Sequence, residues 1–281
     1  MKKLLIFTIL YLSIQLLIAQ PEDKKLGKIT FLMVDGDYED AVDKAEKLKD
    51  DSEYRKNAWV YYYLSQAYFE IAGTPELQED YPKALKESIK AAYKLAKYKN
   101  KPKENLEVYE TAKEFLSALK DSVITVSEIY YDNENYRKAA YYTKSITRFS
   151  PDDYGVWLMK GVYEVKSRNI GEGVKSMLLA MDSLNPAYVP DKSSAVTLVD
   201  ALDEYVLILK SGEYDQYFKT YKFNPTQKDI DRALELKKIF MKYVEQEKII
   251  TKEDRKKDSE TIYKTFRSDD EEEEEDEEED E

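Results

Sequence analysis

The sequence contains no cysteine and no histidine in its 281 residues. These two absences exclude disulfides, zinc fingers, iron–sulfur clusters, haem ligation by histidine, and the Ser-His and Cys-His nucleophiles. Glycine and proline are also scarce, with 8 of each, whereas 36% of the residues are charged. This composition argues against a barrel or sandwich with many tight turns and favours an all-α protein.

Motifs for catalysis are missing as well. The sequence has no Gly-rich phosphate loop, no Ser-x-x-Lys nucleophile and no paired-carboxylate motif in a recognisable context. The acid pairs at 39–40 and 152–153 fall in expected turns, where acids commonly cap helices. Residues 132–135 (Asp-Asn-Glu-Asn) are rich in oxygen, but they lack the glycine and terminal glutamate of an EF-hand and are expected to form a hairpin turn. We therefore expect no catalytic residue, no metal site and no cofactor.

Negative charge is concentrated at the C-terminus. Residues 269–281 are thirteen consecutive acids, and without them the 57 acids fall to 44, which equals the 44 lysines and arginines. The body is therefore neutral, and the tail repels a phosphate backbone, so nucleic acid is not expected as a partner. The tail is predicted to be disordered, and two roles remain open for it: a solubility device or an electrostatic arm that recruits a basic partner.

The N-terminus has the pattern of a secretory signal peptide. Lys2 and Lys3 precede an apolar run from Leu4 to Ile18, and the run ends at Ala19. Fifteen residues fall short of the roughly 20 that a membrane-spanning helix needs. We expect residues 1–19 to be cleaved, which places the protein in the periplasm or outside the cell without stable membrane insertion. The alternatives are an uncleaved anchor and a buried N-terminal helix.

Five segments along the body share an acidic or amide residue, an aromatic residue or Ile, two free positions and a small residue. They are Asp37-Tyr38-x-x-Ala41, Asp80-Tyr81-x-x-Ala84, Asn135-Tyr136-x-x-Ala139, Asn169-Ile170-x-x-Gly173 and the degenerate Glu213-Tyr214-x-x-Tyr217. Each follows one helix-periodic stretch and opens another, so each is predicted to be the turn of a helical hairpin. The polar residue is expected to cap the incoming helix, and the small residue to let the two helices approach each other.

These units resemble the tetratricopeptide repeat over most of residues 24–222. The positions that carry the resemblance are Tyr61, Leu64, Ser65, Tyr68, Ala84, Ser88 and Ala91 in one unit, Val123, Val126, Ser127, Tyr130, Ala139 and Pro151 in the next, and Trp157, Gly161, Gly173, Met177 and Ala180 in the third. In this third unit Lys160 and Glu164 replace the usual Leu and Tyr. Two flanking units, 26–48 and 195–221, are degraded. The resemblance implies an α-solenoid of about five helical hairpins.

The solenoid body is expected to span residues 20–248. Residues 103–132 contain neither Gly nor Pro. This absence predicts one extended helix or two helices joined near Asp121. Asn224-Pro225-Thr226 followed by Asp229 predicts a stop and then a capping helix that reaches about 247. Its expected buried residues are Ile230, Leu234, Ile239, Phe240 and Tyr243. Residues 249–268 are expected to form a polar helix or a linker before the tail.

The 25 tyrosines are the most unusual part of the composition. Successive helix residues point about 100° apart, so some rings of the clusters Tyr61-Tyr62-Tyr63, Tyr130-Tyr131 and Tyr141-Tyr142 are expected to face solvent or a groove. The resemblance implies that the first helices of successive repeats line a groove that binds a peptide or a partner's helix. The groove residues that it implies are Trp59, Tyr62, Gln66, Phe69, Ile124, Glu128, Tyr131, Leu158, Val162 and Lys166. The alternative for each is packing against an insertion or the long helix.

Taken with the export signal, these features predict a non-catalytic scaffold or adaptor of the cell envelope that binds another protein or peptide. Two other functions remain open. One is a structural subunit that self-associates through its aromatic surface. The other is an exported hydrolase or lyase that acts through carboxylates and tyrosines.

Overall fold

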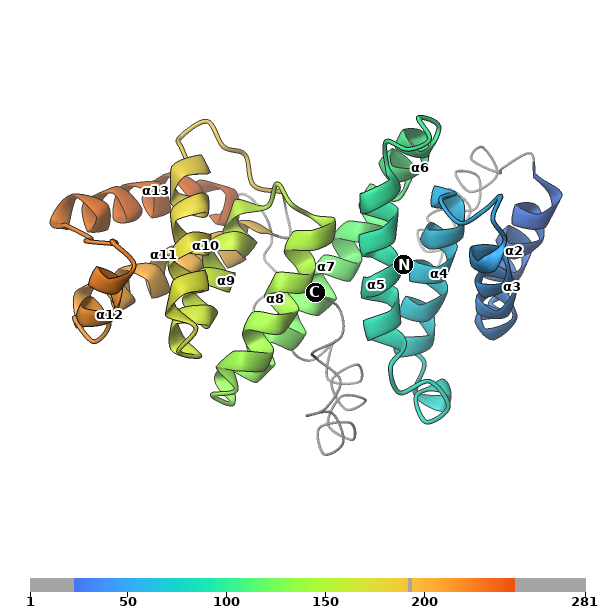
Figure 1. Ribbon diagram of the computed structural model, residues 1–281, viewed down its shortest axis with the longest axis horizontal. Helices are drawn as coiled ribbons and strands as arrows, with labels where there is room; N and C mark the ends of the chain where they lie inside the picture. Colours follow the sequence, from blue (N-terminus) through green and yellow to red (C-terminus); the bar gives the residue numbers. More distant parts are fainter. Residues whose placement is uncertain (1–22, 192–193, 246–281) are drawn as a thin grey trace. The chain divides into compact units, whose positions relative to one another are not determined.

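A computed structural model describes residues 23–191 and 194–245. These residues form α-helices joined by turns, with no strand among them (Figure 1), so the predicted all-α class is confirmed. Within this part of the chain, no helix is long and apolar enough to cross a lipid bilayer. The predicted signal peptide, the polar segment 249–268 and the acidic tail lie outside the described residues.

Helix contacts divide the chain into two compact units, with the boundary between Phe115 and Leu116. The described helices of the first unit are α2 (Lys24–Asp35), α3 (Tyr38–Asp50), α4 (Ala58–Ala72), α5 (Ala84–Tyr98) and α6 (Asn105–Thr111), with the 3₁₀ turn η1 (Pro75–Leu77) between α4 and α5. Helix α4 is central, because α2, α3, α5 and α6 all pack against it.

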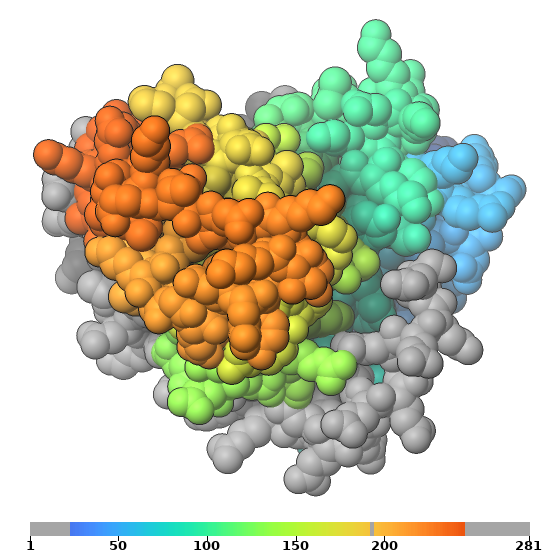
Figure 2. Space-filling model, turned by 60° about the vertical axis from the view of Figure 1, so that its left-hand side comes forward, coloured from blue at the N-terminus to red at the C-terminus, as the bar shows by residue number. Residues whose placement is uncertain are grey.

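The second unit contains most of α7 (Lys113–Asp132), which begins at the boundary. It continues with α8 (Tyr136–Phe149), α9 (Tyr154–Lys166), α10 (Ile170–Ser183), α11 (Ser194–Ser211), α12 (Asp215–Thr220) and α13 (Gln227–Glu245). Helix α9 packs against α8, α10 and α11, and α11 packs against α13. Figure 2 shows α11, α12 and α13 in orange as one continuous surface of this unit.

The five sequence signatures do lie in the turns that lead from one helix to the next. In four of them the residue just before the signature has a left-handed backbone, with φ of 83° at Gly36, 61° at Glu134, 70° at Arg168 and 65° at Gly212. The same local turn therefore recurs along the chain. Side-chain capping is less general than predicted, because among the five only Asn135 is recorded as capping its helix, by accepting a bond from the Lys138 N–H (3.2 Å).

The paired helices approach most closely at the small positions. A Cβ added to Gly173 of α10 would lie 2.8 Å from the Gly161 carbonyl oxygen of α9, and one added to Gly161 would lie 2.8 Å from the Met177 backbone nitrogen. In the first unit, Ser65 and Ser88 are in similarly close contact, because each hydroxyl donates to the other's carbonyl oxygen at 2.8 and 2.7 Å. The predicted packing role of the small positions is confirmed.

Replacing Gly173 with Ala is expected to destabilise the protein by about 1–3 kcal/mol, because the new methyl group meets backbone atoms that cannot move aside. Gly27→Ala is the matched control. Gly27 also lies in a helix, but a Cβ there meets nothing within 4 Å. The control is expected to gain about 0.5–1 kcal/mol from helix propensity. Urea denaturation measures both changes, and equal midpoints for the two variants would contradict the close α9–α10 contact.

Two expectations need correction, one about the position of a helix break and one about the buried residues of α13. Residues 103–132 form two helices, but the break falls at Ala112, and α7 runs unbroken through Asp121. Helix α13 begins as predicted, because Asp229 accepts bonds from both the backbone N–H (2.7 Å) and the hydroxyl (2.8 Å) of Thr226. Its contact with α11 uses another stripe, so the fully buried residues are Ala233, Leu236 and Phe240. Of the residues predicted as buried, Leu234 is exposed, and Ile230, Ile239 and Tyr243 are only partly buried.

Among the tyrosine clusters, Tyr141 is 43% exposed, as expected, but the expectation was wrong for Tyr61-Tyr62-Tyr63. All three side chains are buried, with exposed fractions of 4%, 7% and 2%. The expectation assumed a helix with one solvent face. Four helices surround α4, so consecutive residues can point in different directions and still be covered.

Candidate protein-binding surface

The predicted groove residues of the first unit form an aromatic cluster on α4. The rings of Tyr62 and Phe69 each pack edge-on against Phe115, with centroids 5.9 and 5.8 Å apart, and Trp59 lies 5.8 Å from Tyr62. Tyr62 is buried, whereas Trp59, Gln66 and Phe69 are half-buried. The sequence therefore located an aromatic cluster, and a role for it in binding stays a prediction.

Four of the six predicted groove residues in the second unit are core residues. They are Ile124, Glu128, Leu158 and Val162, each no more than 2% exposed. Tyr131 and Lys166 are half-buried and reach the surface. Of these six residues, only Tyr131 and Lys166 are therefore accessible from solvent.

Tyr131 and Lys166 come together although 35 residues separate them. The Lys166 ammonium donates a hydrogen bond to the Tyr131 hydroxyl and lies 4.6 Å from the centroid of its ring. It also forms an ion pair of 2.8 Å with Glu204. The Tyr131 ring stacks on Tyr163 at 4.7 Å. One cation thus joins α7, α9 and α11, the first helices of three successive hairpins; we call Tyr131, Lys166 and Glu204 the first-helix cluster.

The phenol of Tyr131 is held in its neutral form. Burial raises the pKa of Tyr131 well above its usual value, and the hydrogen bond and charge of Glu204 raise it further. The phenol therefore stays neutral at physiological pH. A neutral phenol beside a paired lysine and carboxylate offers hydrogen-bond donors and acceptors that suit peptide recognition.

Exposed leucines lie on two helices of this unit, a first helix and a second helix of different hairpins. Leu207 follows Glu204 by three residues on α11, so the two are neighbours on the helix surface, and Leu207 is 60% exposed. Leu178 and Leu179 belong to α10, a second helix of a hairpin, and are 41% and 44% exposed. We call the surface formed by the first-helix cluster and Leu207 the first-helix face, and the surface around Leu178 and Leu179 the α10 face. The first-helix face combines an apolar side chain with polar groups, whereas the α10 face has two adjacent leucines.

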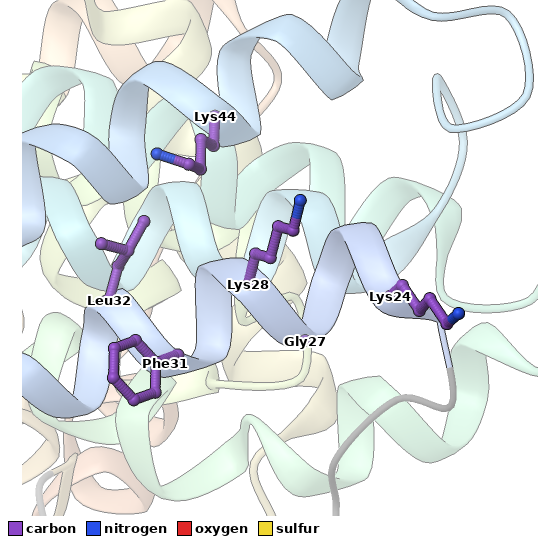
Figure 3. A pocket seen from close by; sticks show the side chains of 6 residues that line it. All are labelled: Lys24, Gly27, Lys28, Phe31, Leu32 and Lys44. Carbon is purple, nitrogen blue, oxygen red and sulfur yellow. The ribbon is translucent and has the colours of Figure 1, made fainter.

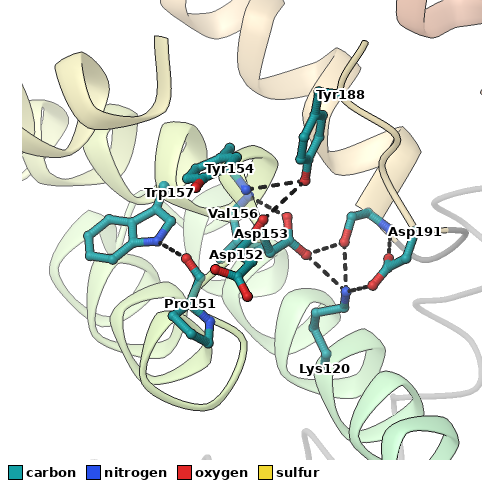
Figure 4. Close-up of polar contacts among 10 residues, drawn as sticks. Lys120, Pro151, Asp152, Asp153, Tyr154, Val156, Trp157, Tyr188 and Asp191 are labelled. Atoms are coloured by element: carbon teal, nitrogen blue, oxygen red, sulfur yellow. Dashed lines mark hydrogen bonds and ion pairs between the residues drawn. The ribbon is translucent and has the colours of Figure 1, made fainter. Parts of the chain in front are cut away.

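A buried ionic network that sequence reasoning missed lies elsewhere in this unit (Figure 4). The Lys120 side chain of α7 is only 2% exposed, and its ammonium lies 2.9 Å from an Asp153 carboxylate oxygen and 2.7 Å from the Ser194 hydroxyl. It also pairs with Asp191. Asp153 caps α9 through the Val156 N–H at 3.1 Å. The sequence did contain a signal for this network. Lys120 stands at a position where the apolar period of α7 predicts a core residue.

This network does not have the properties of a Ser-Lys catalytic pair. Burial alone would lower the pKa of Lys120, but the charges and hydrogen bonds of Asp153 and Asp191 outweigh burial and raise it. Lys120 therefore stays protonated and cannot accept the Ser194 proton. Ser194 is itself 1% exposed. The arrangement ties α7 to the start of α9 and to the segment before α11.

The two departures from the repeat pattern in the third unit compensate each other. Lys160 and Glu164, which stand where Leu and Tyr are usual, form a buried ion pair of 2.9 Å one helical turn apart. Ser176 of α10 completes it, because its hydroxyl accepts from Lys160 at 2.7 Å and donates to Glu164 at 2.8 Å. A satisfied polar triad thus replaces two apolar side chains in the contact between α9 and α10.

Among the described residues, no group of three or more acidic side chains is placed to hold a metal ion. Comparison with models of known protein families and with curated proteins found no match to this chain.

Proposed function

We propose that this protein is a non-catalytic scaffold of the cell envelope, of the tetratricopeptide-repeat kind, that binds a partner protein or peptide on the first-helix face of its second unit. The observation that carries the proposal is the first-helix cluster. Lys166 brings three successive first helices together at a surface-accessible point and supplies a neutral phenol, a cation and a carboxylate there. Export through residues 1–19 is part of the same proposal.

The chemistry of this surface supports the proposal that it binds a partner. Leu207 provides exposed apolar area beside Glu204, and the packed core beneath the cluster fixes Tyr131 in one orientation. A preorganised aromatic side chain loses little entropy on binding, and aromatic and apolar anchors typically dominate protein interfaces. Catalysis is not part of the proposal, because Ser194, which lies 2.7 Å from the Lys120 ammonium, is buried and Lys120 stays protonated.

Leu207→Ser is expected to weaken partner binding about tenfold or more, because it removes an exposed apolar anchor without touching the core. The full-length protein is immobilised and used to capture partners from an exported-protein fraction, and the affinity of the captured partner is then measured for each variant. Leu178→Ser is the matched control, since Leu178 is also an exposed leucine on a helix of the same unit. It is expected to bind as the unchanged protein does.

Two results would redirect the proposal. Binding that is lost in Leu178→Ser and kept in Leu207→Ser would move the site to the α10 face. Capture of the chain by itself alone, in all variants, would favour the self-associating structural subunit over an adaptor.

A further inference from the structure

A shallow hollow of about 460 Å³ lies on the outer side of α2 and α3 in the first unit. Figure 3 shows its lining, which consists of Lys24, Gly27, Lys28, Phe31, Leu32 and Lys44. Apolar side chains and lysines surround the same small depression. This combination suits an occupant that carries both apolar and acidic groups.

The apolar part of the hollow belongs to an exposed stripe of α2 that continues past the hollow to Val34. Phe31 is 64% exposed and Val34 is 60% exposed, whereas Leu26 and Ile29 on the inner side of the helix are buried. Gly27, Phe31 and Val34 follow one another at intervals of four and three residues, which places them along one side of the helix. The end of a helical-repeat array normally presents a polar surface to solvent.

The charges around the hollow are almost unneutralised. Among the described residues, Lys24 and Lys28 take part in no ion pair. Lys44 approaches Asp40 only at 3.9 Å, with both side chains well exposed. Three positive charges therefore face the depression. An acidic occupant would neutralise them, whereas a second copy of this helix would oppose lysine to lysine.

We propose that the occupant is the C-terminal segment of this chain, residues 262–281, supplied by the same molecule or by a neighbouring copy. This segment has the required composition, with Ile262, Tyr263 and Phe266 just before the thirteen consecutive acids. The proposal makes the acidic tail an interaction arm whose first target is the protein itself.

An anionic lipid surface is the main rival occupant, since lysines beside exposed phenylalanine also suit a membrane interface. The tail argues against it, because thirteen acids on the same chain repel an anionic surface. The two occupants respond oppositely to the experiment below.

Zero-length carbodiimide coupling of the full-length protein tests the proposal, because it joins lysine amines to carboxylates only where they touch. Mass spectrometry is expected to find residues 269–281 joined to Lys24, Lys28 or Lys44 in preference to the exposed Lys97 and Lys210, which serve as internal controls. Coupling should fade in 1 M salt, where the Debye length is about 3 Å. A mixture of isotopically labelled and unlabelled protein assigns the contact to one molecule or to two.

Phe31→Ser tests the apolar half of the contact. Phe31 is largely exposed, so the change leaves the core intact, and coupling to the three lysines is expected to fall about tenfold with the loss of one aromatic anchor. Coupling spread evenly over all exposed lysines would overturn the proposal. So would coupling that Phe31→Ser leaves unchanged. Loss of sedimentation with anionic phospholipid vesicles in Phe31→Ser, with no tail preference in the coupling, would identify lipid as the occupant instead.

Discussion

Lys120→Met is expected to lower the free energy of unfolding by about 3–5 kcal/mol, the usual cost of removing one partner from a buried ion pair. Asp153 is 5% exposed, and its carboxylate would remain buried without the cation that now lies 2.9 Å away. Losing the cation would cost less at Asp191, because water already solvates about half of its side chain. Urea denaturation followed by circular dichroism measures the loss.

The double variant Lys120→Met, Asp153→Asn is the informative control. Asparagine caps helices as well as aspartate does, so the start of α9 keeps its cap while the buried charge disappears. We expect the second change to recover part of the stability lost in the first. Lys210→Met, at an exposed position, should be neutral. A Lys120→Met variant as stable as Lys210→Met would show that the network contributes nothing to the fold.

Raising the pH above 10 is expected to unfold the protein cooperatively. Burial raises the pKa of Tyr61 and of Tyr63 to about 12, whereas tyrosines of an unfolded chain titrate near 10. Between these values the unfolded state binds fewer protons than the folded state, so stability falls as the pH rises. Each such tyrosine contributes a loss of about 1.4 kcal/mol per pH unit. Lys120 acts in the same direction, because its raised pKa stabilises the fold only while the lysine is protonated.

Phenolate absorbance and helical circular dichroism are measured together from pH 8 upward to test this expectation. The part of the phenolate signal that disappears in the Tyr61→Phe, Tyr63→Phe double variant belongs to the buried rings. This part should rise at the pH where the helical signal falls, because these phenols ionise only when the helices unfold. Tyr61→Phe with Tyr63→Phe should make the alkaline decline shallower, although each loses a hydroxyl hydrogen bond of 2.6 Å at neutral pH. Tyr141→Phe, at a 43% exposed position, is the control. A rise of the phenolate signal assigned to Tyr61 and Tyr63 while the helices are still intact would contradict the burial of these rings.

Several features of this protein were determined by the sequence itself, because they depend on neighbours along the chain. Helical periodicity and the scarcity of glycine and proline predicted the all-α class. The signatures predicted the hairpin turns, and the Thr226 and Asp229 pair predicted the start of α13. Gly161 and Gly173 were identified as packing positions from their spacing, since only residues without bulk fit where two helices of a hairpin cross.

Tertiary structure alone decided which polar and aromatic groups share a site. Lys120 lies 33 residues from Asp153 and 71 from Asp191, and no local pattern links them. Lys166 and Glu204 are 38 residues apart, so the sequence named Tyr131 and Lys166 of the first-helix cluster but not Glu204. Burial of Tyr61, Tyr62 and Tyr63 required four neighbours around α4. The periodicity of a helix records which sides are apolar, but exposure also depends on how many other helices cover those sides, and that number is set by the packing of the whole unit.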